Sequence, residues 1–396
     1  MFVYADNAAT TKISKKALEA VVSASENYYG NPSSLHSVGQ EAAEQLFHAR
    51  ERIAEHINAK SPREIYFTSG GSEADNQAII SIAENGKKKG KNHIISSAFE
   101  HHAVLHTLNK LEKQGFEITL LDVHKNGIVD PAELEAAIKE ETCLVTIMFA
   151  NNEIGTIQPI KEIGRICKEK GVLFHTDAVQ AAGHVPIDVQ DMHIDLLSLS
   201  AHKFHGPKGI GVLYCRNGIL LHNLIEGGAQ ERSKRAGTEN LPAILGMAEA
   251  LDEACSNMTK TSEYVTNLRN KLIKGLSTIP HSVVNGDVEN RLPGNVNMCF
   301  EGIEGESLLL LLDMKGIQAS SGSACTSGSL DPSHVLLSIG LPHEVAHGSL
   351  RLTFSEENTM EEIEYIIQEV PQIVDYLRNM SPVWESLEKG EINHVI

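Results

Sequence analysis

A lysine and a carboxylate each stand at the end of a strand-like apolar run. Residues 196–201, with the sequence LLSLSA, lead into His202 and Lys203, and residues 172–176 lead into Asp177. Each residue alone would more often be a solvated lysine or a turn carboxylate. Together, at neighbouring strand ends, they supply what pyridoxal phosphate (PLP) requires: an amine for its aldehyde and an acid for its pyridine nitrogen.

The segment 68–73, TSGGSE, offers an anion site because it follows a strand and opens a predicted helix. Ser72 would equally serve as an ordinary helix cap. The phosphate interpretation gains support from Ser200, which stands beside His202 on another strand, so that both ends of one cofactor could be held at one sheet edge. No P-loop motif is present, which disfavours a nucleoside triphosphate site.

Three further residues could contact a cofactor or substrate. His101 follows the strand-like run 93–96, where a neutral imidazole could stack on a flat ring and exchange protons, although a lone histidine is more often structural. Asn152 is as good a turn residue as a ligand. Arg351, within an apolar run, is either paired structurally or set to grip a carboxylate at two points.

Cys325 lies in a serine- and glycine-rich loop, residues 320–331. Such a loop is expected to pack poorly and to move, so this thiol is expected to swing. An incidental exposed cysteine is the alternative, but a mobile thiol beside a PLP lysine indicates that sulfur is transferred. The six cysteines are scattered, which favours reduced thiols in the cytoplasm over a disulfide framework.

Apolar runs that alternate with amphipathic stretches predict an α/β fold with a mainly parallel sheet flanked by helices. The expected strands are residues 64–68, 93–96, 117–122, 143–149, 172–176, 195–200 and 209–214, and the expected helices between them include 73–85, 103–114, 131–140 and 160–170. Ligands then bind at the carboxyl ends of the strands. Lys203 and Asp177 fall at that edge.

The length of 396 residues exceeds what one core usually serves, so two domains are expected. After Gly237 a long helix at 241–276 leads to a smaller α+β domain with strands at 295–300 and 349–354. We predict an N-terminal segment, 1–14, associated with the small domain, a large PLP-binding domain, 15–255, and a small domain, 256–396, that carries the Cys325 loop.

The formal net charge of −18 would repel a phosphate backbone, so direct nucleic-acid binding is not expected. No basic, apolar leader is present, and the richest apolar run, 308–312, is far too short to span a bilayer. These features predict a cytoplasmic protein that has no membrane contact. No two cysteines are close enough to suggest a CxxC zinc pair, and we predict no metal among the site residues.

Several motifs together resemble the cysteine desulfurases of the NifS/IscS type, in the class V aminotransferase group of fold-type I PLP enzymes. They are DNAATT at 6–11, YGNPSSLH at 29–36, TSGGSE at 68–73, NNEIG at 151–155, HTDAVQ at 175–180, SAHK at 200–203, RAGTEN at 235–240 and SGSACTS at 321–327. The resemblance runs from Asp6 to beyond Arg351, and the loop around Cys325 resembles the group I form.

The resemblance implies a role for each candidate residue. Lys203 would bind the PLP aldehyde and later move protons, and Cys325 would be the nucleophile. Asn152 and Arg351 would hold the substrate carboxylate. The remaining cofactor contacts would be Asp177 at the pyridine nitrogen, Gln180 at the ring hydroxyl, His101 over the ring, and Gly71, Ser72, Ser200, His202 and a partner subunit's Thr238 at the phosphate.

The implied reaction converts L-cysteine to L-alanine, with the sulfur taken by Cys325 as a persulfide. The resemblance further implies a homodimer with shared active sites and sulfur-acceptor proteins such as an iron–sulfur scaffold or a tRNA-thiolation enzyme. Gly71-Ser72 stands where many relatives have Ala-Thr, and Phe204-His205 replaces the more usual Ile-Tyr. Neither change removes a group that the reaction needs.

Two alternatives remain open at the level of sequence. The same scaffold serves selenocysteine lyases and aminotransferases, and the histidines and exposed cysteine also suit a noncatalytic thiol-bearing or metal-binding scaffold. The segment around Trp384 resembles the tail by which relatives meet an iron–sulfur scaffold, and it suits a helix-end packing residue equally well.

Overall fold

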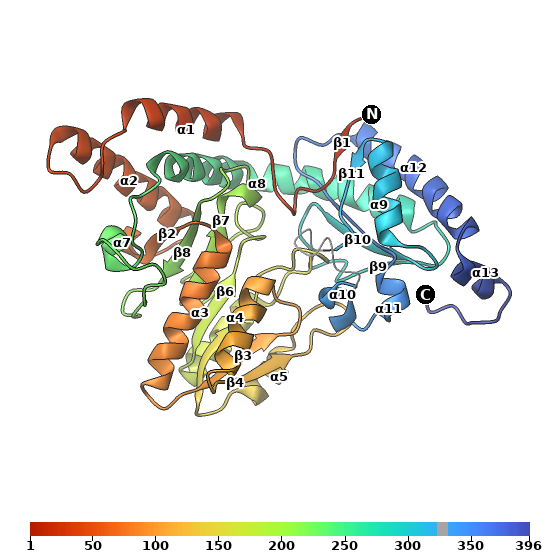
Figure 1. The fold of residues 1–396 in the computed structure, drawn as a ribbon, viewed down its shortest axis with the longest axis horizontal. Helices are drawn as coiled ribbons and strands as arrows, with labels where there is room; N and C mark the ends of the chain where they lie inside the picture. The colour runs from red at the N-terminus through yellow and green to blue at the C-terminus, as the bar shows by residue number, and fades with distance from the viewer. Residues whose placement is uncertain (323–331) are drawn as a thin grey trace.

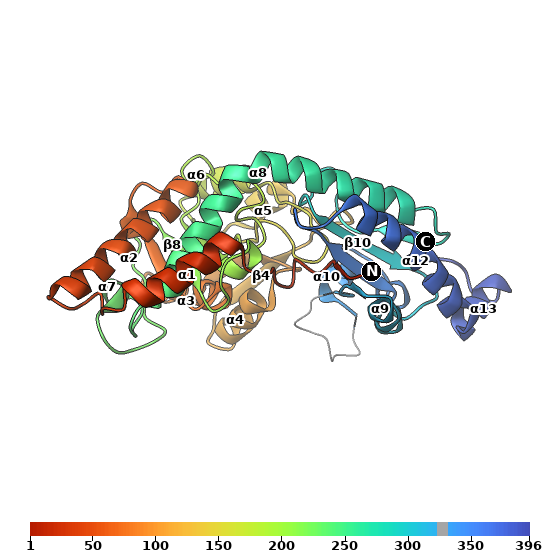
Figure 2. The same cartoon turned by 90° about the horizontal axis from the view of Figure 1, so that it is seen from above.

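The computed structural model describes residues 1–322 and 332–396, which form two lobes joined by a long helix (Figure 1; Figure 2). The larger lobe contains a seven-stranded sheet with the strand order β2-β8-β7-β6-β5-β3-β4. Its strands are β2 (Ile65–Thr68), β3 (His93–Ser97), β4 (Glu117–Leu121), β5 (Thr142–Thr146), β6 (Leu173–Asp177), β7 (Leu196–Ser200) and β8 (Gly211–Cys215). Only the pairs that involve β8 are antiparallel, so the sheet is mainly parallel as predicted.

Helices cover both faces of this sheet, and the strands alternate accordingly. Ile94 and Leu144 pack on one face with α3 (Gly71–Lys87) and α4 (His102–Glu112), whereas Ile95 and Val145 pack on the other. That second face is covered by α2 (Ser37–His56), α6 (Ile160–Lys170) and the first part of α8 (Leu241–Leu276). The other helices of the larger lobe are α1 (Lys15–Asn27), α5 (Pro131–Ala137) and α7 (Gln230–Ser233).

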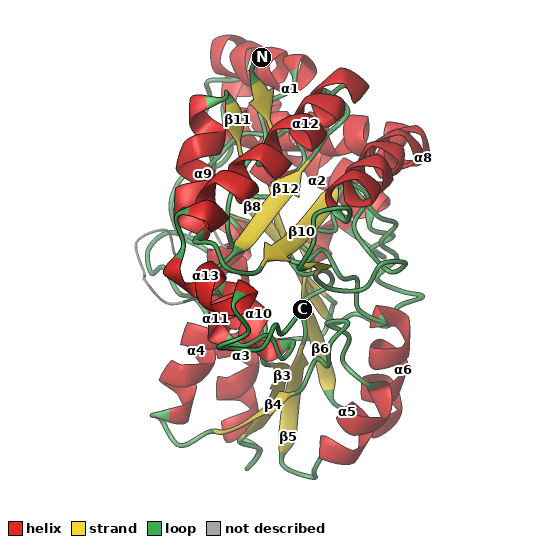
Figure 3. Ribbon diagram, turned by 90° about the vertical axis from the view of Figure 1, so that its right-hand side faces the viewer, coloured by secondary structure: helices red, strands yellow, loops and turns green. Residues whose placement is uncertain are grey.

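The smaller lobe has its own core around an antiparallel sheet in the order β12-β10-β9 (Figure 3). These strands are β9 (Ser282–Val284), β10 (Asn295–Phe300) and β12 (Ser349–Thr353), packed by α9 (Gly305–Met314) and α12 (Met360–Asn379). The short helix α13 (Pro382–Glu388) follows α12, whereas the buried residues of α10 (His334–Ser338) and α11 (His343–Ala346) pack on the core of the larger lobe. No helix in the described ranges is long and apolar enough to cross a membrane.

The N-terminal strand belongs to the sheet system of the smaller lobe. β1 (Val3–Tyr4) pairs with β11 (Ile317–Gln318), and Asp6 forms a bridge with Thr353. The chain then crosses to the larger lobe, where the amide of Thr11 donates to the carbonyl of His202 over 2.9 Å. The division into 1–14, 15–255 and 256–396 remains a prediction.

The sequence predicted the sheet but not the helices that precede it. Helices α1 and α2 bury mainly alanines, such as Ala17 and Ala42, so no run of large apolar side chains marks them in the sequence. The helix expected at 131–140 ends at Ala137. β8 runs against its neighbours because the turn at 204–211 returns the chain directly into the sheet beside β7.

Helix α8 contributes to both cores, and this leads to a test of stability. Leu268 is fully buried in the smaller core, whereas Lys274 on the same helix is exposed. Leu268→Ala is expected to lower the free energy of unfolding by about 2–5 kcal/mol, because it leaves a cavity. Urea denaturation, followed by the fluorescence of Trp384 in the same lobe, measures this. Lys274→Ala is the matched control, and an equal effect of both changes would contradict the assignment of Leu268 to a packed core.

Candidate active site

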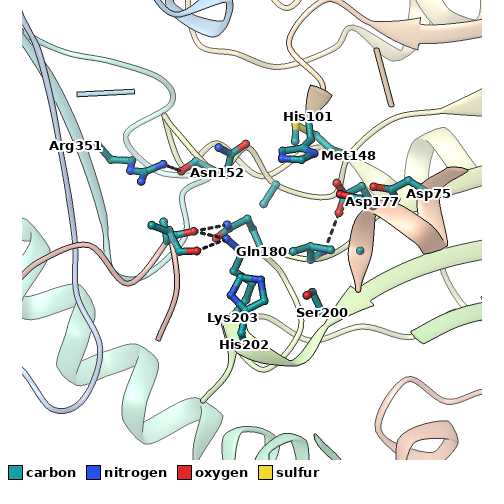
Figure 4. Close-up of a pocket in the computed structure, with 16 residues that line it drawn as sticks. Asp75, His101, Met148, Asn152, Asp177, Gln180, Ser200, His202, Lys203 and Arg351 are labelled. Atoms are coloured by element: carbon teal, nitrogen blue, oxygen red, sulfur yellow. Dashed lines mark hydrogen bonds between the residues drawn. The ribbon is translucent and has the colours of Figure 1, made fainter. Parts of the chain in front are cut away.

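The candidate residues meet at the carboxyl edge of the large sheet. β6 ends at Asp177, β7 ends at Ser200, and the short 3-10 helix η2 (Ala201–Lys203) follows at once. They line a cavity of about 210 Å³ (Figure 4). The cavity is lined by Ala8, Ala9, Gly71, Ser72, Asp75, His101, Met148, Ala150, Asn152, Asp177, Val179, Gln180, Ser200, His202, Lys203 and Arg351.

The amine of Lys203 is oriented by the backbone of the N-terminal segment. Its Nζ donates to the carbonyls of Ala8 and Ala9 over 2.6 and 2.8 Å. Gln180 Nε2 donates to the same Ala8 carbonyl over 3.0 Å. These bonds hold the amine of Lys203 and the amide of Gln180 on one side of the cavity.

Asp177 and His101 form the opposite wall. Asp177 is 7 % exposed, and one carboxylate oxygen accepts from the amide of Val179 over 2.9 Å. Burial raises the pKa of Asp177, while the nearby His101 and Lys203 act to lower it. His101 caps α4, with its Nδ1 accepting from the amide of Ala103 over 3.1 Å, so its neutral form carries the proton on Nε2. A buried acid is thus available for a ring nitrogen and an imidazole for a ring face.

The third wall is built to receive an anion. Helix α3 begins at Gly71 without a side-chain cap, so its first amides are open, and a Cβ at Gly71 would lie only 2.6 Å from a methyl of Val179. Ser72, Ser200 and His202 line the same wall. Burial lowers the pKa of His202 to about 4, so at neutral pH its ring is an uncharged hydrogen-bonding group.

Arg351 closes the far end of the cavity, where the smaller lobe meets the larger. Its side chain is 1 % exposed and donates to a carboxylate oxygen of Asp6 over 2.9 Å and to the carbonyl of Asn152 over 3.2 Å. Its buried Nε has no hydrogen-bond partner within residues 1–322 and 332–396. This guanidinium is therefore partly paired and still offers a donor.

Asp75 is a member of the site that the sequence did not reveal. It is 1 % exposed, its Oδ1 lies 3.6 Å from His175 Nε2, and that oxygen has no hydrogen-bond partner in the described part of the chain. Burial, followed by the charge of Asp177, raises its pKa well above the usual range. The available signal was spacing, because Asp75 follows Ser72 by three residues and so shares its side of α3.

The residues present fit PLP. The open start of α3 suits a phosphate, buried Asp177 suits a protonated ring nitrogen, and the two unpartnered polar atoms, Asp75 Oδ1 and Arg351 Nε, show a site with unused hydrogen-bonding capacity. The atoms of Asp75, His101 and Asp177 also lie close enough for a metal ion, but two buried acids beside an imidazole serve a ring nitrogen equally.

Two predicted residues are not brought into this cavity by the described chain. Thr238 is exposed and lines a separate hollow with Ser69 and Gly237. Cys325 lies outside the described residues. The remaining predicted site residues all line the one cavity.

Comparison with known proteins places the chain in a family. The model of the class-V aminotransferases matches residues 3–366. The chain therefore belongs to the class-V aminotransferase family, whose cysteine desulfurases depend on PLP. Within it, the chain groups with the proteins named cysteine desulfurase IscS.

The relatives match over nearly the whole chain. A protein of Clostridium botulinum (strain Hall) named cysteine desulfurase IscS is 56 % identical over 392 residues, which is 98 % of both chains. A protein of the same name from Methanosarcina thermophila is 55 % identical over 96 % of this chain and 94 % of its own. A solved structure described as a NifS-like protein has a TM-score of 0.89 and 38 % identity, and covers 95 % of this chain and all of its own. A structure titled SspA in complex with cysteine has a TM-score of 0.79 and 37 % identity, and covers 89 % of this chain and 98 % of its own.

Glu100, which directly precedes His101, is expected to make the stability of the fold depend on pH. Burial raises its pKa to about 8, so the folded protein keeps a proton that the unfolded chain releases near about pH 4.3. Stability is therefore expected to fall as the pH rises between these two values. Glu100→Gln mimics the protonated acid and is expected to flatten this decline in urea denaturation between about pH 5 and pH 8.

The control for this measurement is Glu112→Gln, an exposed position on α4. It is expected to keep the slope of the parent protein. Equal slopes for the parent and Glu100→Gln would contradict a protonated Glu100.

Proposed function

We propose that this chain is a PLP-dependent cysteine desulfurase that uses Lys203, Asp177 and Arg351 around one cavity and Cys325 as its sulfur acceptor. The observation that carries the proposal is the convergence of a strand-end amine, a buried acid and a partly paired guanidinium on that cavity. Bound PLP supplies an aldehyde for the substrate amine and an electron sink that weakens bonds at the substrate carbon.

In this proposal each wall has one task. The open amides of α3, with Gly71, Ser72, Ser200 and His202, bind the phosphate. Asp177 keeps the pyridine nitrogen protonated, and its burial excludes water from that proton. Gln180 contacts the ring hydroxyl, and His101 lies over the ring face. Lys203 Nζ carries the proton that moves at the substrate carbon.

The substrate end of the cavity selects a carboxylate. Arg351 Nε is the open donor, and Asn152 stands beside it in the wall. Asp6 already neutralises part of the guanidinium charge of Arg351. The carboxylate of the substrate would therefore be bound by hydrogen bonds as well as by charge. An amino acid such as L-cysteine fits this pairing.

Sulfur transfer is assigned to Cys325. L-cysteine and the Cys325 thiol give L-alanine and a Cys325 persulfide, so the C–S bond of the substrate breaks and one S–S bond forms. On either side of residues 323–331, Ser333 Oγ donates to the carboxylate of Glu153, and a Cβ added at Gly322 would lie 3.3 Å from the same carboxylate oxygen. Glu153 directly follows Asn152 of the cavity wall. The described chain on both sides of residues 323–331 therefore lies near the cavity wall.

The persulfide is then passed to an acceptor, such as an iron–sulfur scaffold or a tRNA-thiolation enzyme, in the cytoplasm. The cysteines at 143, 167, 215, 255 and 299 are free thiols, which agrees with a reducing compartment. Helices α1 and α2 lie at the end of the larger lobe that is farthest from the smaller lobe (Figure 2), and large apolar side chains are exposed on them and on their connection, which supports a homodimer. They are Leu18, Val22, Tyr29, Leu35 and Phe47. In that dimer the exposed Thr238 reaches the phosphate site of the other subunit.

Two single substitutions test the reaction. Lys203→Ala is expected to lose the visible absorbance of bound PLP and all alanine formation. Cys325→Ser is expected to keep that absorbance while sulfur transfer to a thiol acceptor falls by at least about a thousandfold, because a hydroxyl cannot form a persulfide. Full sulfur transfer by Cys325→Ser, or undiminished absorbance of Lys203→Ala, would overturn the assignment.

A charged residue introduced at an exposed apolar position tests the proposed dimer. Leu35 is 95 % exposed, so Leu35→Asp leaves the fold of the subunit intact and is expected to shift the protein towards monomers in size-exclusion chromatography with light scattering. Leu310→Asp, at a position 69 % exposed on α9 of the smaller lobe, is the matched control and is expected to stay dimeric. A dimer that withstands Leu35→Asp, or a parent protein that is monomeric, would contradict this interface.

A further inference from the structure

A second cluster of potential ligands lies in the smaller lobe, away from the active-site cavity. His281 precedes β9, Glu301 follows β10, and His394 belongs to the segment 390–396. One nitrogen from each histidine and one oxygen of Glu301 all lie within 4.8 Å of one another. His394 Nδ1 is 2.8 Å and His281 Nδ1 is 3.6 Å from the same carboxylate oxygen, Oε2.

The carboxylate at the centre of this cluster is buried, whereas the imidazoles reach the surface. The side chain of Glu301 is 5 % exposed, and those of His281 and His394 are 33 % and 31 % exposed. The other carboxylate oxygen of Glu301, Oε1, accepts from the amide of Val395 over 2.8 Å. An ion at this position would thus be held from inside by Glu301 and would still have an open side for water.

The cluster stands on a fixed support. Arg378 of α12 donates to the backbone carbonyls of Glu301 and His281, each over 3.0 Å, and its guanidinium lies 3.9 Å from the ring centre of Trp384. Trp384 in turn meets the rings of His281 and His394 edge-on, each at 5.6 Å between centroids. Two of the three ligands therefore have positions that the lobe itself determines.

Charge favours a cation between these groups. Among the described residues, the ion-pair partners of Glu301 are the two histidines, which carry charge only when protonated. Arg378 uses its hydrogen bonds on backbone carbonyls instead. The guanidinium of Arg378 lies near this buried carboxylate but forms no ion pair with it among the described residues, and a divalent ion would neutralise the carboxylate directly.

We propose that His281, Glu301 and His394 form a binding site for a divalent transition-metal ion, with Zn²⁺ as the best match, and that the ion fastens the segment 390–396 to the smaller lobe. Two imidazoles and one carboxylate, with water as a fourth ligand, are a donor set that suits Zn²⁺. The sequence predicted no metal, because the three ligands lie far apart along the chain.

Metal binding requires a local rearrangement that the segment can provide. The two imidazole rings are stacked, with centroids 3.6 Å apart and planes 16° from parallel, so their lone pairs must turn towards one point. His281 Nδ1 must also release the carbonyl of Ile396, to which it now lies at 2.8 Å. Because ligand nitrogens must be unprotonated, affinity is expected to fall as the pH is lowered through the histidine range.

Trp384 provides a built-in reporter, because it is the only tryptophan in the chain. The experiment titrates Ni²⁺, whose unpaired electrons quench a nearby indole, into the PLP-loaded Cys325→Ser protein, which lacks the Cys325 thiol as a competing ligand. We expect saturable quenching at one ion per chain and its reversal by Zn²⁺. His394→Gln and Glu301→Gln are each expected to weaken binding by at least about tenfold.

His343→Gln, at an exposed histidine of the same lobe, is the matched control and is expected to bind like the parent. Hydrogen exchange of residues 390–396 is a second measurement and is expected to slow when Zn²⁺ is added to the parent but not to His394→Gln. Absent or non-saturable quenching in the parent, or equal affinity in His394→Gln and the parent, would overturn the proposal. The circular dichroism and PLP absorbance of each variant show that the protein is folded and loaded.

Discussion

The backbone of residues 6–11 holds the two ends of the active-site cavity in register. The carbonyls of Ala8 and Ala9 hold the amine of Lys203, while the carboxylate of Asp6 holds the guanidinium of Arg351. The same stretch begins beside the small sheet and ends at the turn that contains Lys203. The separation between the amine and the guanidinium, and so the size of the molecule that fits between them, depends on a short segment that supplies mostly backbone atoms.

The electrostatics of the site follow from burial. Three acids are buried at the cavity, Asp75 and Asp177 in its wall and Glu100 next to His101 of that wall, and burial raises the pKa of each of them. His175 beside them and His202 above are held neutral by the same effect, since burial lowers the pKa of an imidazole. The site thus favours protonated acids and keeps His175 and His202 uncharged.

The sequence predicted those parts of the fold and site that local patterns encode. Apolar runs that end at Asp177 and Ser200 predicted strands and placed their last residues at one edge, and the structure confirms both. Asp75 was missed because a carboxylate on a helix is ordinary until its surroundings are known to exclude water. The contact of Asp6 with Arg351 was likewise beyond reach, since it joins residues 345 apart in the chain.

Helix α8 sets the mechanics of the molecule. It is continuous over 36 residues, yet the buried positions stop at Leu251 and resume at Val265, so the stretch between them spans from one core to the other. An unbroken helix resists sharp bending and cannot change its length, because its backbone bonds are all in place. The helix therefore couples the two lobes mechanically. Any widening of the cavity between them bends the helix slightly over many residues instead of rotating the lobes about a single hinge.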